Sequence, residues 1–171
     1  MQETFNPGYC TIESADLITP EGVSEPITGL IGRFDIQQSM SSPTITGSID
    51  ILDGLGILTT LPIRAEENLK LKLKSHDLQT ELSLDLQVIE ISNVTIQKQS
   101  GDTYAYTLHF ITRSSWNALT QNVITAFRSR SASYCAKQIF KKHFKLGKER
   151  KFNIEESDGE MRVVIPDYNP I

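Results

Sequence analysis

Apolar and polar residues alternate along most of the first two thirds of the chain. Over residues 44–51, Ile45, Ile49 and Ile51 fall on one side, with threonine, serine and aspartate on the other. The run 69–74 alternates leucine with lysine without a fault, and residues 81–88 repeat the pattern with leucines and a valine. Period-two alternation is typical of strands with one buried face. We therefore expect a series of half-buried strands up to Thr112.

Weaker strands are predicted over 9–18, which a Pro-Gly turn at 19–22 closes, and over 30–37. A short helical turn is expected through Leu58, and the strand 104–110 returns after a predicted hairpin turn at 100–102. At Val88 and Ile89 the apolar phase slips by one residue, which turns every later side chain to the opposite face. This slip predicts a β-bulge or a strand that crosses between sheets. Long, bent strands of this kind are typical of a closed or nearly closed barrel.

After Thr112 the apolar period changes to about 3.6 residues, which indicates helices. The first predicted helix begins at Ser114 or Ser115, the second at Ser131 or Ser133, and Gly147 is expected to end the second. Their apolar positions are Trp116, Leu119, Val123 and Phe127 in the first, and Ala136, Ile139, Phe140 and Phe144 in the second.

These patterns together predict an α+β, mostly β fold in three parts. An antiparallel β-barrel region covers residues 1–112, a helix pair covers 113–147, and a further β segment starts in 148–171. Because no evident terminal element precedes Ile171, we expect the natural polypeptide to continue beyond it.

Composition is that of an ordinary globular protein, with 39% hydrophobic and 22% charged residues in a chain of 171. No apolar run approaches the roughly 20 residues that a membrane span needs, and the first five residues do not form a signal peptide. Cys10 and Cys135 match no metal or redox spacing, so we expect two reduced thiols.

The net charge of −4 hides an asymmetry between the two parts of the chain. Residues 1–127 carry 7 Lys and Arg against 15 Asp and Glu, whereas residues 128–171 carry 10 against 6. Such a bipolar chain suits association of identical copies, since opposite patches attract. Two solvated faces of unlike sign are the alternative interpretation.

The basic stretch from Arg128 to Lys151 is the most distinctive charge feature. Four of its lysines are spaced so that they lie on one stripe of the second predicted helix, and three more point outward from the strand over 69–74. These seven candidate interface residues are Lys137, Lys141, Lys145, Lys148, Lys70, Lys72 and Lys74. The stripe fits nucleic-acid binding, a solvated face, or docking onto an acidic protein neighbour. Aromatic interleaving for base stacking is absent, because Phe140 and Phe144 fall on the apolar face.

No pattern of catalytic or ligand-binding residues emerges. His76, His109 and His143 have no Cys, Asp or Glu at metal-ligand spacing, and His109 is expected to point outward from its strand. Nucleophile-elbow and phosphate-loop motifs are missing from the sequence. The pairs Glu66–Glu67 and Glu155–Glu156 are adjacent in sequence and do not face each other. We therefore predict a non-enzymatic protein without catalytic residue, cofactor or metal.

The order of these motifs resembles that of central baseplate hub proteins of contractile-tailed phages. The resemblance rests on 45–54, which ends in Asp53-Gly54, on Leu61-Pro62-Ile63, and on Glu66-Glu67-Asn68-Leu69. Residues 104–110, the helix pair, and 152–155 leading to Ile165-Pro166 follow in the family's order, so that it spans about residues 27–171. The sequence departs from the pattern at Arg64-Ala65, where the family often has a glycine.

The resemblance implies a tail-tube-like β-barrel in a phage tail baseplate. Such hubs form trimers whose barrels make a ring continuous with the tail tube, seat the central spike below, and meet tube-initiating and tape-measure proteins above. It further implies assembly in the host cytoplasm, no specific nucleic-acid binding and no membrane. An acidic barrel with Asp50, Asp85 and Glu90 toward the lumen would suit a channel that passes DNA without holding it. The alternatives are another tail-tube-fold protein, such as a tube initiator or distal tail protein, and a β-barrel nucleic-acid-binding module that uses the lysine stripe.

Overall fold

The chain forms two compact units, Met1–Arg113 and Ser114–Ile171. The computed structural model describes residues 10–40, 44–61, 63–75, 81–97, 103–120, 123–143 and 153–165. The predicted hairpin turn at 100–102 and the predicted helix end at Gly147 lie outside these ranges.

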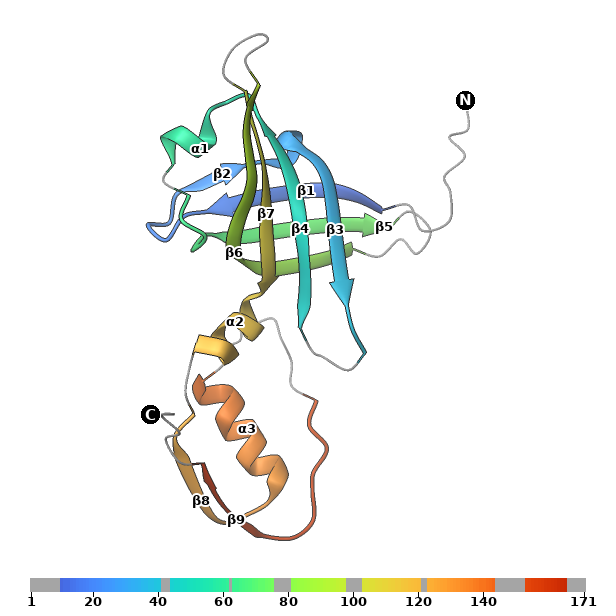
Figure 1. The fold of residues 1–171 in the computed structure, drawn as a ribbon. Coiled ribbons are helices and arrows are strands. Elements are labelled where there is room, and N and C mark those ends of the chain that lie inside the picture. The colour runs from blue at the N-terminus through green and yellow to red at the C-terminus, as the bar shows by residue number, and fades with distance from the viewer. Residues whose placement is uncertain are drawn as a thin grey trace. The chain divides into compact units, whose positions relative to one another are not determined.

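The first unit is one antiparallel sheet of seven strands in the order β2-β1-β5-β6-β7-β4-β3. In Figure 1, β1 and β5 run across the direction of β7, β4 and β3, so that the sheet curls into a half-barrel. This confirms the predicted mostly β fold. The strands are β1 (Cys10–Ile18), β2 (Ser24–Pro26), β3 (Ile31–Gln38), β4 (Ile45–Asp53), β5 (Asn68–Ser75), β6 (Glu81–Gln97) and β7 (Thr103–Thr112). A 3-10 turn, η1 (Thr28–Leu30), precedes β3, and a short helix, α1 (Ile57–Thr60), follows β4.

The 17-residue strand β6 joins the two directions of the sheet. Its first part pairs with β5 over Glu81–Gln87, and its later part pairs with β7 over Leu86–Gln97. The register shifts between Val88 and Glu90, which confirms the bulge predicted from the phase slip. A second shift lies between Ser92 and Thr95, where Asn93 adopts a φ of 54°. Bulges bend and twist a strand, so β6 can serve both parts of the curled sheet.

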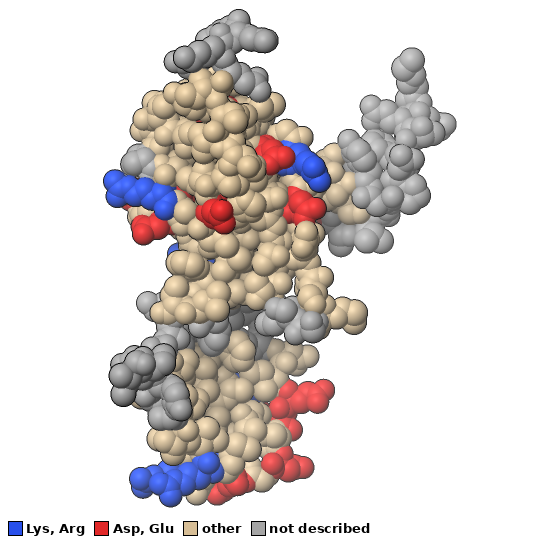
Figure 2. All heavy atoms as spheres, in the orientation of Figure 1, with Lys and Arg blue, Asp and Glu red and all other residues tan. Residues whose placement is uncertain are grey.

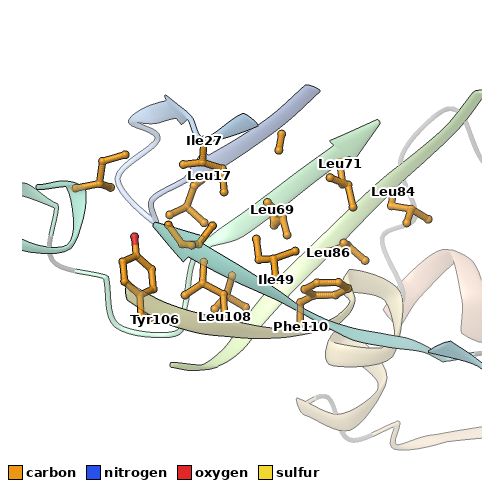
Figure 3. Close-up of a cluster of buried hydrophobic side chains, with 14 of the residues drawn as sticks. Leu17, Ile27, Ile49, Leu69, Leu71, Leu84, Leu86, Tyr106, Leu108 and Phe110 are labelled. Carbon is orange, nitrogen blue, oxygen red and sulfur yellow. The ribbon is translucent and has the colours of Figure 1, made fainter. Parts of the chain in front are cut away.

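Alternating side chains of the strands fill the inside of the curl. Figure 3 shows Leu17 of β1, Leu69 of β5, Leu86 of β6 and Leu108 of β7 pointing into one cluster. The predicted apolar faces of β4, β5 and β7 are buried as expected, whereas Leu82, at the start of β6, is 51% exposed. Each fully buried large apolar side chain contributes roughly 1.5–3 kcal/mol to folding.

Gly47 lets two neighbouring strands and one aromatic ring meet at this core. It pairs with Ile36 of β3 and with Phe110 of β7. A Cβ atom at this position would overlap the backbone oxygen of Asp35 and lie 2.7 Å from Cζ of Phe110. The absent side chain is therefore a packing requirement.

Two fully buried carboxylates hold the turns on either side of α1. Oδ1 of Asp53 accepts the Leu55 amide at 3.1 Å, and Oδ2 accepts the Leu58 amide at 2.8 Å. Burial and the charge of Asp53 raise the pKa of Tyr106 above its ordinary value.

The second carboxylate, that of Glu67, closes the turn before β5. Its Oε1 accepts the Arg64 amide at 2.7 Å, and its Oε2 accepts the Glu66 amide at 3.1 Å. Between them, Ala65 has a φ of 63°, a left-handed conformation that favours glycine. This is the turn at Arg64-Ala65, where the phage hub family often has a glycine. Here an alanine takes the backbone conformation that is usual for glycine.

The second unit contains α2 (Arg113–Thr120, whose first residue belongs to the first unit), β8 (Thr125–Arg130), α3 (Ala132–His143) and β9 (Met161–Ile165). β8 and β9 pair antiparallel. The prediction of a first helix through Val123 and Phe127 was wrong, because α2 ends at Thr120 and Phe127 lies in β8. The β-branched run Val123-Ile124-Thr125 alternates into Phe127 equally well with period two, and such residues favour strands.

The second predicted helix is present as α3. Ser131 is its N-cap, because its Oγ accepts the Tyr134 amide at 3.3 Å while its carbonyl accepts the Cys135 amide. Cys135 is buried and Cys10 is half-buried, and both are free thiols.

Candidate assembly surfaces

One open edge of the curled sheet is β3. It pairs with β4 along its length, and within the residues that the structure describes it has no ladder partner on its other side. Phe34 and Ile36 of β3 pack against the core yet stay half-buried, as side chains at an uncovered edge do. An edge strand with free backbone groups and partly covered apolar residues is a template for pairing with another chain.

The other open edge is the first part of β1. β2 covers only Asp16–Ile18 of β1. At Ala15 the edge is closed by the hydroxyl of Thr28, which accepts the Ala15 amide at 2.8 Å, and by the Ile27 amide, which donates to the Ala15 carbonyl at 2.9 Å. Over 10–14, the described part of the chain supplies a backbone ladder on the β5 side alone.

A polar face covers the outside of β3, β4, β7 and the later part of β6. Thr107 donates to Oδ1 of Asp50 at 2.8 Å, and Asn93 donates to Thr107 at 3.4 Å. The face carries three acids, Asp35, Asp50 and Glu90, against one basic residue, Arg33. Asp50 and Glu90 are exposed and point away from the apolar core. Two shallow hollows of about 300 and 390 Å³ lie over this face.

His109 lies on the polar face, half-buried, as its position in the strand predicted. Its Nε2 is 2.8 Å from Oγ of Ser92. A serine hydroxyl beside an imidazole could act as a nucleophile with its base, but this base would need a third group to orient it. Among the residues that the structure places, the His109 ring donates no hydrogen bond to a carboxylate. The pair therefore links β6 to β7 across the bulged stretch.

The three lysines of β5 lie exposed between two neighbouring strands. Lys70 is paired across the sheet with Asp16 of β1 and Asp85 of β6, and Lys74 is paired with Glu81 of β6. Figure 2 shows acidic and basic side chains of the first unit interspersed in one band. The pairing of Lys70 and Lys74 with acidic residues of the neighbouring strands places the three lysines of β5 on a surface of mixed sign. Asp85, which is half-buried, also lies 3.9 Å from Arg113. The role of these lysines in an interface stays a prediction.

The lysine stripe of α3 is less basic than its sequence indicates. Lys137 forms an ion pair with Glu156, a residue 19 positions further along the chain. Lys141 is exposed, whereas Lys145 and Lys148 lie outside the described residues. The sequence interpretation considered the basic stretch by itself, so it missed the carboxylate of Glu156 that the fold brings to Lys137. Neutralising one of the four positions weakens the nucleic-acid interpretation of the stripe.

Ser133, Glu156 and Ser157 fasten the segment 153–160 to the beginning of α3. The Ser133 amide donates to Oγ of Ser157 at 2.9 Å, and the Ser157 amide donates to Oγ of Ser133 at 3.2 Å. The Ser133 hydroxyl donates to Oε2 of Glu156 at 3.3 Å. The hydrogen bond and charge of Lys137, followed by the Ser133 hydroxyl, hold the pKa of Glu156 below its ordinary value.

The lowered pKa of Glu156 predicts how this attachment depends on pH. A carboxylate with a depressed folded-state pKa stabilises above its unfolded pKa, and that contribution disappears as pH falls through the folded value. We expect the amides of 153–160 to be less protected from exchange, relative to their intrinsic rates at each pH, below about pH 4 than at pH 7. Glu156→Gln should show the lower protection at pH 7 already, and its protection should change little on acidification.

Glu155→Gln is the matched control, because Glu155 is an exposed neighbour that has no hydrogen bond or ion pair to any other described residue. Hydrogen exchange followed by mass spectrometry measures the segment directly. An equal response of the two variants at pH 7 would show that the Glu156 contact does not hold the segment.

Two further observations on the described residues concern membrane spans and metal sites. None of the helices that these residues form is both long and apolar enough to cross a membrane. Within the same ranges, no group of three or more His, Cys, Asp or Glu side chains could hold a metal ion.

The fold and its surfaces define a class: an open, curled antiparallel half-barrel followed by a small α/β unit. No protein-family model matches the chain, and no curated protein matches it. Among solved structures, it is similar to the Escherichia coli c3393 protein, described as a component of the type VI secretion system with structural similarity to the T4 bacteriophage tail proteins gp27 and gp5. The match has a TM-score of 0.49 and 10% identity, and covers 93% of this chain and 40% of that one.

Proposed function

We propose that this chain is a non-enzymatic structural component of a phage-type tail baseplate hub. In this proposal, copies of the chain associate, as a trimer, into a ring that joins the tail tube to the central spike. The sequence resemblance over residues 27–171 is the reason for proposing a phage-type tail baseplate as the particle. The open edges of the sheet support assembly independently of that resemblance.

One observation carries the proposal: within the described residues, the curled sheet is left open at both ends. A barrel that closes on itself leaves no edge strand. Here β3 and the first part of β1 lie at opposite ends of the strand order, with a core already complete between them. Pairing of β3 of one copy with β1 of the next would satisfy both edges and extend the wall from copy to copy.

The polar face fits the inner wall of such a ring. It is hydrogen-bonded, carries acids in excess and faces away from the apolar core. Negative charge along a channel would let DNA pass without sticking. In the same arrangement the second unit, which carries the basic part of the sequence, would be available to neighbouring proteins such as the spike, the tube initiator or the tape measure.

The mass of the assembly tests this proposal. We expect native mass spectrometry and light scattering of the full chain to show a discrete oligomer, a trimer, at micromolar concentration. A double variant Gln37→Lys with Gln38→Lys adds two charges to the exposed end of β3 and should lower the mass to that of the monomer, because edge lysines block strand pairing.

The control variant Leu55→Lys with Thr59→Lys adds equal charge at exposed positions near α1, away from both edges. It should assemble like the unmodified chain. A monomeric mass for the unmodified chain at every concentration, or equal loss of assembly in both variants, would refute the proposed ring.

A further inference from the structure

The second unit has a groove between β8 and α3 that the assembly proposed above does not use. Its volume is about 260 Å³. β8 contributes Phe127, Arg128 and Arg130 to its lining, and α3 contributes Tyr134, Gln138 and Lys142. α3 contacts β8, and β9 pairs with β8. Within the described residues, no side chain of β9 lines the groove, and β8 pairs with β9 alone, which leaves the other edge of β8 without a ladder partner.

The groove has an aromatic floor. The rings of Phe127 and Tyr134 meet edge to face, with centroids 6.5 Å apart and planes at 90°. The Arg130 guanidinium lies 5.0 Å from the centroid of the Tyr134 ring, which holds this cation over the groove by a cation–π contact. Apolar contact area and a positioned positive charge are thus combined in one place.

The charge of the groove has one sign. Arg128, Arg130 and Lys142 are exposed, and no acidic side chain lines the groove in the described part of the chain. Lys137 of α3 is paired with the Glu156 carboxylate, and it does not line the groove. Among the described residues, Arg128, Arg130 and Lys142 have no carboxylate partner, so their charge is available to carboxylates from outside.

The geometry of the walls selects an extended ligand. Along α3, Tyr134, Gln138 and Lys142 recur every four residues, a row of about 12 Å that an extended peptide covers in roughly four residues. β8 lines the other wall, and among the described residues one of its edges has no ladder partner. A strand added to an open sheet edge gains backbone hydrogen bonds, while its alternate side chains reach one wall.

We propose that this groove binds an extended acidic peptide segment of another protein, which adds to β8 as a third strand. Its carboxylates pair with Arg128, Arg130 and Lys142, and its apolar side chains pack on Phe127 and Tyr134. The site concerns the second unit alone, so it does not depend on ring formation by the first.

Binding of a defined probe to the full chain tests the site. The probe is a short fluorescent peptide in which glutamate alternates with valine and threonine, and anisotropy measures its affinity. We expect it to bind more tightly at low salt. A peptide with lysine in place of glutamate should not bind, and one with N-methylated backbone amides should bind about tenfold more weakly, because it cannot donate to β8.

Arg130→Ala with Lys142→Ala should weaken the glutamate peptide by about tenfold or more. Arg162→Ala is the control, since Arg162 is an exposed cation of β9 outside the groove. Lys142→Ala alone, at an exposed position, gives the same direction of change if the double variant fails to fold.

Four results would overturn the proposal. The first is equal binding of the glutamate and lysine peptides, and the second is an equal loss of affinity in the Arg162→Ala control. The third is tighter binding of single-stranded oligothymidine than of the glutamate peptide. The fourth is evidence that the groove binds a second copy of this chain. The last would appear as a fall in oligomer mass when Arg130 and Lys142 are replaced.

Discussion

Replacing Gly47 with alanine should destabilise the first unit by about 3 kcal/mol or more, among the largest effects of a single methyl group in this chain. The added Cβ would collide with the Asp35 carbonyl, a backbone atom held by the β3–β4 ladder, and with the ring of Phe110 in the core. A flexible side chain could move aside, but a ladder carbonyl moves only if the two strands separate. Urea unfolding followed by far-ultraviolet circular dichroism measures the loss.

Gly29→Ala is the matched control for this substitution. No atom lies within 4 Å of the Cβ that it would add, and the residue does not need a left-handed φ. Its effect should stay between zero and a gain of about 1 kcal/mol, because alanine restricts the unfolded chain. The double variant Gly47→Ala with Phe110→Leu should recover only part of the loss, since the Asp35 carbonyl remains in place. Equal stability of the two single variants would contradict the close approach of β3 and β4.

Replacing Glu67 with alanine should cost about 2–4 kcal/mol. The change removes both oxygens that accept the Arg64 and Glu66 amides, and it leaves a void where a fully buried side chain lay. Buried amides without acceptors are costly because they have lost their water. The thermal unfolding midpoint and the urea midpoint should both fall.

Two companion variants distinguish the hydrogen bonds from general damage to the turn. Glu66→Ala changes the exposed neighbour and should stay within about 0.5 kcal/mol of the unmodified chain. Glu67→Gln keeps the shape but offers one acceptor oxygen to two amides, so its cost should fall between those of the other variants. An equal response to Glu66→Ala and Glu67→Ala would show that the carboxylate does not hold the turn.

The sequence pattern predicted the strands well because a half-buried sheet imposes its period on the residues directly. The leucines of β5 and the register shift of β6 at Ile89 follow from alternation alone. Strand order does not follow from it, since pairing β1 with β5 and β4 with β7 depends on contacts far apart in the sequence. Consequently the open edges, on which the proposed assembly depends, could not be read from the sequence.

The buried carboxylates were missed for a related reason. Asp53 and Glu67 stand in a sequence like surface acids, and Glu67 was set aside because its neighbour Glu66 cannot face it. Their burial is acceptable only because each receives two backbone amides, and this depends on turn geometry. The Asp-Gly pair at the end of β4 was the available signal, because an aspartate there often accepts amides of the following turn.

Gly47, Asp53 and Glu67 all lie in the stretch that carries the sequence resemblance. Gly47 permits the close approach of β3 and β4, and the carboxylates of Asp53 and Glu67 close turns. The resembling residues therefore specify how the half-barrel is built. The surfaces that would meet other proteins are formed by other residues, such as Gln37 and Gln38 on β3 and Arg130 and Lys142 on the groove.

The long strand β6 also determines an order of folding. Its hairpins with β5 and β7 connect residues close in sequence, so they close short loops, whereas β1 and β4 must reach their partners over long ones. The β5-β6-β7 meander should therefore nucleate the first unit, with β4 and β3 on one side and β1 and β2 on the other docking afterwards. The strands that dock last are those that carry the open edges. A folding chain would therefore present these edges to a neighbouring copy only after its apolar core has formed.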